Sequence, residues 1–188
     1  MIAWIVLALV AAAAAWGVVA YNRLVRLRNA SESAWSDIDV QLKRRYELVP
    51  NLVETVKGYA SHERGTFEAV TEARSRAMSA EGPQAKAEAE GALTRSLRGL
   101  FAVAEAYPEL RANQNFLSLQ EELARLEDAI QNARRYYNAV VRDLNTSCEV
   151  FPSNLVAGAF GFSKRDYFEL DAEAERSAPR VRFGSEGA

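Results

Sequence analysis

The side chains best suited to chemistry in this sequence are a single histidine and a few scattered glutamates. His62 is followed by Glu63, but Thr66 stands where a zinc protease motif of the type His-Glu-x-x-His needs its second histidine. The sequence also has no Gly-x-Ser-x-Gly nucleophile elbow, no P-loop and no dinucleotide-binding fingerprint. We therefore predict no catalytic residues, no metal site and no cofactor, and we expect that the protein is not an enzyme.

Carboxylates are the remaining candidates for a metal or ligand site. The glutamates that could meet across facing helices are Glu54, Glu63, Glu105 and Glu122. Di-iron bundles require Glu-x-x-His pairs, whereas the residue three positions before His62 is Tyr59. We favour the interpretation that polar residues such as Asn51, Asn115 and Asn138 cap or cross-link helices through hydrogen bonds. A ligand-binding or carboxylate-metal bundle, acting as a carrier or an enzyme at the membrane face, is kept as the alternative.

The beginning of the chain is an apolar stretch, residues 2–21, without a charge or a proline. About 20 helical residues rise about 30 Å, which matches the hydrocarbon core of a bilayer. Trp4, Trp16 and Tyr21 lie towards its two ends, where aromatic rings favour the headgroup region. The stretch is longer than the core of a secretory signal, and no Lys or Arg precedes it. We therefore predict an uncleaved transmembrane anchor that begins at Ile2.

Three juxtamembrane arginines set the expected orientation of this anchor. Arg23, Arg26 and Arg28 all follow the apolar stretch, and basic flanks stay preferentially in the cytoplasm. We expect the N-terminus outside, the bulk of the chain in the cytoplasm, and the protein in the inner (cytoplasmic) membrane. The expected organisation is an anchor with these arginines over residues 1–28, an α-helical bundle domain over 29–168 and a disordered tail over 169–188.

The composition of the chain narrows the classes of partner. The formal net charge is −2 and no motif with interleaved aromatic and basic residues occurs, so we exclude nucleic acid. Cys148 is the single cysteine, which rules out an intramolecular disulfide. The partners that we expect are the membrane, a second copy of the chain in a homo-oligomer, or other envelope proteins. No small-molecule substrate is inferred.

Apolar residues recur at helical spacing almost throughout the chain after Ser31. Pro50 removes a backbone donor, so we expect the first of these helices to kink or restart there, with Asn51 in a new first turn. The segment Ala80-Glu81-Gly82-Pro83 combines a helix stop with a proline start. It predicts a reversal of the chain direction.

The most regular pattern lies in the last long helix. Pro108 ends the preceding helix near Tyr107, and Asn113 and Asn115 are candidate caps for the helix that follows. Apolar residues then alternate at spacings of three and four, at Phe116, Leu119, Leu123, Leu126, Ile130, Ala133, Tyr137, Val140 and Leu144. This period of 3.5 predicts a left-handed supercoil, either within the chain, which we favour, or with a second chain. The predicted fold class is all-α, an antiparallel up-and-down bundle of long helices behind the transmembrane helix, with a short C-terminal helix.

Aromatic residues concentrate near the end of the helical domain. The segment Phe151-Pro152-Ser153-Asn154 predicts a turn into a short apolar helix over residues 155–159. The aromatic and basic residues that follow are Phe160, Phe162, Lys164, Arg165, Tyr167 and Phe168. One interpretation is that these rings close one end of the bundle. The other is that they form an exposed dock for lipid headgroups or a partner.

Four blocks of sequence follow one another behind the apolar stretch. They are RRYELVPNLVETVKGYASHE at residues 44–63, VAEAYPELRANQNFLSLQEEL at 103–123, ARRYYNAVVRDLN at 133–145 and FPSNLVAGAFGF at 151–162. Together they resemble the LemA family of bacterial membrane proteins, over about residues 23–168. The resemblance implies an antiparallel α-helical bundle on a single transmembrane anchor, with the N-terminus outside and no established biochemical activity for the family as a whole.

The signature positions of that family fall on a defined set of residues in this chain. They are Pro50, Asn51, Glu54, Tyr59, His62, Glu63, Glu105, Tyr107, Pro108, Asn115, Gln120, Tyr137, Asn138, Pro152, Asn154, Gly161 and Phe162. With Phe160, they are our candidates for interaction residues. The predicted function is a membrane-anchored helical interaction or scaffolding protein of unknown molecular activity, because the anchor and the regular apolar seam position a protein and carry no chemistry themselves.

Overall fold

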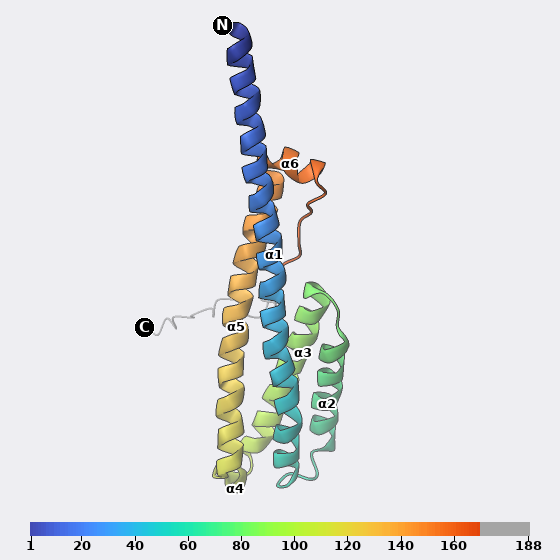
Figure 1. Cartoon of the computed structure of the whole chain (residues 1–188). Helices are drawn as coiled ribbons and strands as arrows, with labels where there is room; N and C mark the ends of the chain where they lie inside the picture. The colour runs from blue at the N-terminus through green and yellow to red at the C-terminus, as the bar shows by residue number, and fades with distance from the viewer. Residues whose placement is uncertain (170–188) are drawn as a thin grey trace, which may run out of the picture.

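The computed structural model describes residues 1–169, which form helices and connecting loops without a strand. The helices are α1 (Ile2–Lys57), α2 (Arg64–Ser79), α3 (Pro83–Glu105), α4 (Pro108–Arg111), α5 (Gln114–Glu149) and α6 (Ser153–Ala159). α1 packs along α5, α2 packs along α3, and the N-terminal part of α1 extends beyond the bundle as a bare helix (Figure 1). The predicted all-α class and helical bundle are confirmed. The predicted tail lies outside the described residues from position 170 onward.

α1 runs from the apolar stretch into the bundle as one helix of 56 residues. From Ala20 onward one of its faces is buried, and Ile38, Leu42 and Val49 on that face are almost completely enclosed. Their helical spacing forms the apolar stripe that the sequence indicates. The expected restart at Pro50 is wrong, because this proline lies inside α1 and no new first turn begins after it.

A side chain of α2 replaces the hydrogen bond that Pro50 cannot make. Without an N–H, Pro50 leaves the carbonyl of Tyr46, one turn earlier, without its helical donor. Arg74 Nε lies 2.6 Å from this carbonyl oxygen and donates to it. The contact explains how the helix continues through the proline, and it also ties α2 to α1.

The chain reverses direction in two loops before α3. The reversal around residues 80–82 agrees with the prediction, and there Gly82 has a φ of +79°, which glycine adopts at little cost. The other reversal, over residues 58–63, is absent from the sequence prediction. Val56 and Ala60 are both buried at this turn, so the helical spacing of apolar residues continues through it and hides the break.

α5 makes the most extensive contact of α1. Its predicted apolar seam is buried or half-buried from Phe116 to Tyr137. One position after Tyr137 is wrong, because Val141 is fully buried whereas the predicted Val140 is only half-buried; the predicted Leu144 is buried. A straight α-helix drifts against a strict 3.5-residue repeat, so a spacing of four after Tyr137 keeps the apolar side chains on the buried face.

Only one of the two candidate caps begins α5. The side chain of Asn113 accepts a 3.0 Å hydrogen bond from the N–H of Phe116, as an N-cap does. Asn115 is exposed within the first turn of the helix. The single-turn helix α4 separates this cap from the end of α3.

After α6 the chain returns along α5 as an extended segment, residues 163–169, which we call the strap. Asn138 binds the backbone of Phe168 through both amide atoms, at 2.9 and 3.1 Å, and Asn145 binds the backbone of Arg165 in the same way, at 2.8 and 2.9 Å. Seven helical residues rise about 10.5 Å and three extended residues span about 10 Å, so the spacings match. The polar cross-link predicted for Asn138 therefore holds the strap instead of another helix, and it seats Phe168 in the core.

The contact between Arg74 and the Tyr46 carbonyl predicts coupled effects on stability. Replacing Arg74 with methionine should lower the free energy of unfolding by about 1–2 kcal/mol, because a partly buried carbonyl loses a charged donor. In a Pro50→Ala background the new N–H can reach the same carbonyl, so this replacement should cost about half as much or less. Denaturation of the four proteins of this double-mutant cycle in detergent micelles measures both costs.

Arg76 supplies the matched control on the same helix. Its contact with Glu72, at 2.7 Å, is an exposed ion pair, so Arg76→Met should cost about 0–1 kcal/mol in either background. Equal costs of Arg74→Met in the two backgrounds would contradict the compensation of Pro50 by Arg74.

Candidate functional site

The N-terminal part of α1 is, among residues 1–169, the one helical segment long and apolar enough to cross a membrane. Its 18-residue window has a mean hydropathy of 2.4, and none of that window is buried by the protein. The side chains of Ile2 and Trp4 are 79 % and 76 % exposed. A continuous apolar surface of this length fits the hydrocarbon core of a bilayer, which would cover it.

Immediately beyond this segment, α6 packs across α1 and α5. Leu24 of α1, Leu144 of α5 and Ala157 of α6 form a small buried cluster separate from the main core. The juxtamembrane arginines are exposed around this cluster. The bundle therefore begins directly where the apolar segment ends, without a linker between them.

Aromatic residues join the end of α6 to this part of α1. The ring of Tyr21 lies edge-on to Phe160 and Phe162, with centroid distances of 4.8 and 5.7 Å. The guanidinium carbon of Arg28 lies 5.4 Å from the ring centroid of Phe162. Gly161, between the two phenylalanines, has a φ of +69°, which favours glycine and lets the chain turn sharply after α6.

The C-terminal aromatic residues divide into buried and exposed rings. Phe168 is completely buried against Trp35, whose ring also contacts Tyr137, and Phe162 is half-buried against the small cluster of Leu24, Leu144 and Ala157. Phe160, in contrast, is 64 % exposed. Some of these rings close the bundle, while others form an exposed apolar surface beside the membrane segment.

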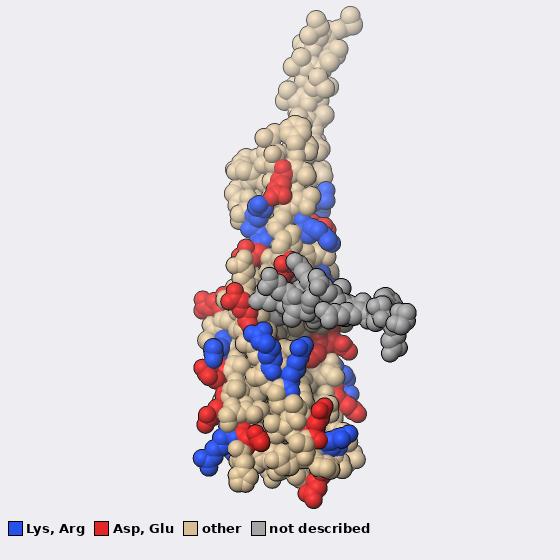
Figure 2. All heavy atoms as spheres, turned by 180° about the vertical axis from the view of Figure 1, so that it is seen from behind, with Lys and Arg blue, Asp and Glu red and all other residues tan. Residues whose placement is uncertain are grey.

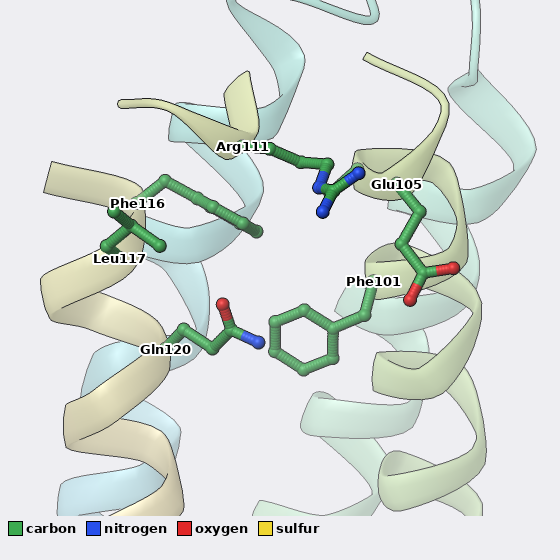
Figure 3. A pocket seen from close by; sticks show the side chains of 7 residues that line it. Phe101, Glu105, Arg111, Phe116, Leu117 and Gln120 are labelled. Carbon is green, nitrogen blue, oxygen red and sulfur yellow. The ribbon is translucent and has the colours of Figure 1, made fainter. Parts of the chain in front are cut away.

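At the opposite end of the bundle, a pocket of about 520 Å³ opens between α3, α4 and α5. Phe101 and Phe116 line it, with ring centroids 6.3 Å apart. Figure 3 shows Glu105, Arg111 and Gln120 around the same space, from three different helices. A carboxylate, a guanidinium and an amide beside aromatic rings offer hydrogen-bond donors, acceptors and an apolar surface to one ligand or segment.

Many family-signature positions gather at this end of the molecule, which we call the distal end. Those on its loops and adjoining helix ends are Tyr59, His62, Glu63, Glu105, Tyr107, Pro108, Asn115 and Gln120. The hydroxyl of Tyr59 accepts a 2.9 Å hydrogen bond from Asn113, which joins the loop after α1 to the start of α5. His62 and Gln120 are exposed. The fold thus brings together residues that are far apart in the sequence.

The four glutamates considered for a metal site do not converge. Glu54, Glu105 and Glu122 are exposed and Glu63 is half-buried. Within the described part of the chain, no group of three or more His, Cys, Asp or Glu residues could hold a metal ion. Glu54 instead contacts Lys57 one turn along α1, at 3.3 Å.

Of the remaining signature positions, Glu54 lies in the last turn of α1 at the distal end, and the others lie along the bundle or around α6. On α1 they are Pro50, Asn51 and Glu54; on α5, Tyr137 and Asn138; around α6, Pro152, Asn154, Gly161 and Phe162. The hydroxyl of Tyr137 donates to the carbonyl of Asp166 at 2.9 Å, so it holds the strap together with Asn138. This second group consists largely of residues that shape the connection between α5, α6 and the strap.

A cluster of charged residues that sequence reasoning missed lies inside the bundle. Arg45 of α1 is 2 % exposed, and its two terminal nitrogens lie 2.7 Å from carboxylate oxygens of Glu90 on α3 and Glu127 on α5. Thr94 of α3 accepts a further hydrogen bond from Arg45, at 2.9 Å. The hydroxyl of Tyr46 donates to the second oxygen of Glu90. We call Arg45, Tyr46, Lys86, Glu90 and Glu127 the buried ion cluster.

Lys86 extends the buried ion cluster to α2. Its Nζ donates to the carbonyl of Ala77 at 3.0 Å and lies 5.8 Å from the ring centroid of Tyr46. The cluster therefore contacts all four long helices of the bundle. Because a buried ion pair gains little over apolar packing but is costly to break, we interpret it as a device that fixes how the helices align.

Burial dominates the ionisation of this cluster. It raises the pKa of the Glu90 carboxyl, although Arg45, Tyr46 and Lys86 oppose that shift. Burial, followed by the charge of Glu90, also raises the pKa of Tyr46, so its hydroxyl stays a donor at neutral pH. Arg45 and Glu90 are each enclosed to 2 % exposure, which keeps substrates away from them.

The buried ion cluster does leave a signal in the sequence. On α3, Lys86 and Glu90 continue the apolar stripe of Leu93 and Leu97 at spacings of four and three. On α1, Arg45 stands between buried apolar residues of the same face. When charged residues occur within the apolar stripes of two helices that pack together, they indicate a buried ion pair.

The fold and these surfaces define a class of protein: a helical bundle continuous with a single helix that is long and apolar enough to cross a membrane. The sequence model of the LemA family matches residues 34–183, and the chain belongs to the LemA family. The resemblance seen in the sequence blocks is thereby confirmed. Membership, together with the apolar segment of α1, indicates a membrane-associated protein.

Three relatives show how far this similarity extends. Magnetosome protein MamQ 2 of Paramagnetospirillum magneticum is 25 % identical over 175 residues, which cover 79 % of this chain and 64 % of the relative. Magnetosome protein MamQ of Magnetospirillum gryphiswaldense is 25 % identical over 174 residues, with the same coverage. Protein LemA of Metamycoplasma hominis is 28 % identical over 137 residues, or 72 % of this chain and 63 % of the relative. The chain thus spans less than two thirds of the length of these relatives.

The raised pKa of Glu90 predicts a pH dependence of stability. A pKa that is higher in the folded than in the unfolded state adds stability below the unfolded value, near 4.5, and this stability is lost as pH rises through the folded value. Glu90→Gln keeps the shape but cannot ionise. The unfolding free energy of the native protein relative to that of Glu90→Gln should therefore fall as pH rises above about 4.5.

Denaturant titrations at several pH values measure this difference. Glu88→Gln, which changes an exposed glutamate on the same helix, is the matched control and should show a flat difference. A native protein that gains stability over Glu90→Gln as pH rises would show that the ion pair with Arg45 outweighs burial, contrary to this account.

Proposed function

We propose that this protein is a membrane-anchored scaffold that holds another protein, or a second copy of itself, at a fixed distance from the membrane. The observation that carries the proposal is the continuity of α1, which forms the apolar segment and one of the two longest helices of the bundle. About 56 helical residues rise about 84 Å. A binding surface at the distal end would therefore be held away from the bilayer by a rigid support.

The distal end offers the surface for such a partner. The pocket between α3, α4 and α5 lies there, lined by apolar rings and by charged and amide side chains. Exposed polar signature residues surround it. Interfaces combine an apolar centre with a polar rim in the same manner.

The proposed orientation places the bundle in the cytoplasm, beneath the inner membrane, with the N-terminus outside. The juxtamembrane arginines support it, since all three lie on the bundle side of the apolar segment and are exposed. Basic residues next to a membrane segment stay preferentially on the cytoplasmic side.

A ligand carrier or enzyme is the alternative, and the distal pocket is the observation that favours it. Its volume of about 520 Å³ falls in the range of small-molecule sites. The interior of the bundle, however, is filled by apolar and paired charged side chains. Scaffolding therefore has the stronger support.

Site-specific photocrosslinking in intact membranes tests the scaffold. A photoreactive amino acid at Leu117 or Gln120, at the distal pocket, should give one reproducible crosslinked species that mass spectrometry identifies as a second copy or as a defined protein. Asp128, exposed on the same helix but outside the pocket, is the matched control. Its crosslinking to that species should be about tenfold weaker, since contact energy concentrates at the centre of an interface.

Two outcomes would contradict the proposal. One is a strictly monomeric protein with no reproducible neighbour at either pocket position. The other is equal crosslinking at Asp128 and at the pocket, which would show non-specific proximity. A small ligand retained by the native protein and lost on Gln120→Ala would favour the carrier instead.

A further inference from the structure

We propose that α6 and the residues beside it lie in the interfacial layer of the same membrane that α1 crosses. The residues concerned are Val150, Phe151, Leu155 and Phe160, which we call the α6 apolar surface. The proposal does not rest on scaffolding, because it concerns lipid contact at the end of the bundle opposite the distal pocket. It gives the protein a second attachment to the bilayer.

Among the described residues beyond Tyr21, the three most exposed large apolar side chains all belong to the α6 apolar surface. Phe151 is 78 % exposed, Phe160 64 %, Leu155 62 % and Val150 49 %. No charged residue occurs between Glu149 and Lys164. Large apolar side chains gathered on one exposed element, without a charge among them, are typical of a surface that another apolar phase covers.

The position of the α6 apolar surface indicates that lipid is the apolar phase that covers it. The ring of Phe160 lies 4.8 Å from that of Tyr21, the last residue of the apolar stretch. α6 covers Leu24, one turn further along α1, so it lies beside the very end of the membrane segment (Figure 1). The apolar surface of α1 and that of α6 are therefore continuous, and a bilayer that ends near Tyr21 reaches Phe160.

The distribution of charged side chains also supports lipid as the phase that covers the α6 apolar surface. Figure 2 shows the protruding end of the molecule free of charged side chains, with both acidic and basic side chains first appearing near the level where the bundle begins. Arg23 and Arg26 are exposed at that level, and Arg28 lies over Phe162. Basic residues beside exposed apolar side chains suit the surface of a membrane with anionic lipids. There the apolar side chains enter the boundary of the acyl chains, and the basic residues bind headgroup phosphates.

The turn at Gly161 determines which way Phe160 and Phe162 face. The N–H of Phe162 donates to the carbonyl of Ala157 at 2.9 Å, which closes the end of α6 around this glycine. Phe162 then packs inward under Arg28 while Phe160 stays outward. The turn directly after α6 thus contains both Phe162, which fixes it to the bundle, and Phe160, which we propose faces lipid.

Fluorescence quenching in nanodiscs of phosphatidylethanolamine and phosphatidylglycerol tests this proposal on the full chain. A Cys148→Ser background with Leu155→Cys carries an environment-sensitive label, and Phe151→Cys repeats the measurement at a second position. Tyr136→Cys is the matched control, since Tyr136 is 57 % exposed but lies on α5 away from α6. Iodide in the aqueous phase and lipids with a spin label near the headgroup serve as the two quenchers.

Labels at Leu155 and Phe151 should be quenched by the spin-labelled lipid. Their quenching by iodide should be weaker than that of the label at Tyr136 by a factor of about three or more, because the headgroup layer shields the side chains that it covers from the aqueous phase. Strong iodide quenching at all three positions would overturn the proposal. Protection from iodide without quenching by lipid would also overturn it, since that result assigns the surface to a protein. Circular dichroism of each labelled protein confirms that the helices are retained.

Discussion

The structure depends on the uninterrupted hydrogen-bonded backbone of α1. Inside a bilayer every backbone polar group needs an internal partner, which a helix provides, and the same helix then supplies one side of the bundle core. Ala20, near the end of the apolar stretch, and Leu24, one turn further on, are already buried by the bundle. The apolar segment and the bundle therefore share one continuous helix, which is the basis for proposing that α1 is a rigid support and not a flexible tether.

Polar contacts protect this continuity where the sequence alone would interrupt it. Arg74 supplies the donor that Pro50 lacks, and it does so from another helix, so the contact sets the position of α2 as well. The buried ion cluster also sets the positions of neighbouring helices, because Arg45 of α1 forms ion pairs with Glu90 on α3 and Glu127 on α5. Such contacts add little net stability, but a shifted helix would leave buried charges unpaired, which restricts the bundle to one alignment.

Much of the fold follows from periodic apolar residues and from proline and glycine positions. The membrane segment, the reversal at Gly82 and the long α5 are apparent in the sequence because each depends on local pattern. The sequence does not predict that the helix continues through Pro50, or that the chain turns over residues 58–63. Both depend on tertiary contacts, namely the hydrogen bond from Arg74 and the burial of Ala60. The distal pocket could not be foreseen either, because it joins Phe101, Arg111 and Gln120 across three helices. Arg45 and Glu90, in contrast, stand at core positions and could have been found.

The most direct test of the central claim is a distance distribution along α1 in nanodiscs. Spin labels at Val10, in the apolar segment, and at Arg44, in the bundle, should lie about 51 Å apart at about 1.5 Å per residue. The distribution should be as narrow as that of a reference pair at Asp37 and Glu54, both within the bundle. A broad distribution, or one centred well below the helical distance, would show a flexible joint between anchor and bundle and would contradict the account.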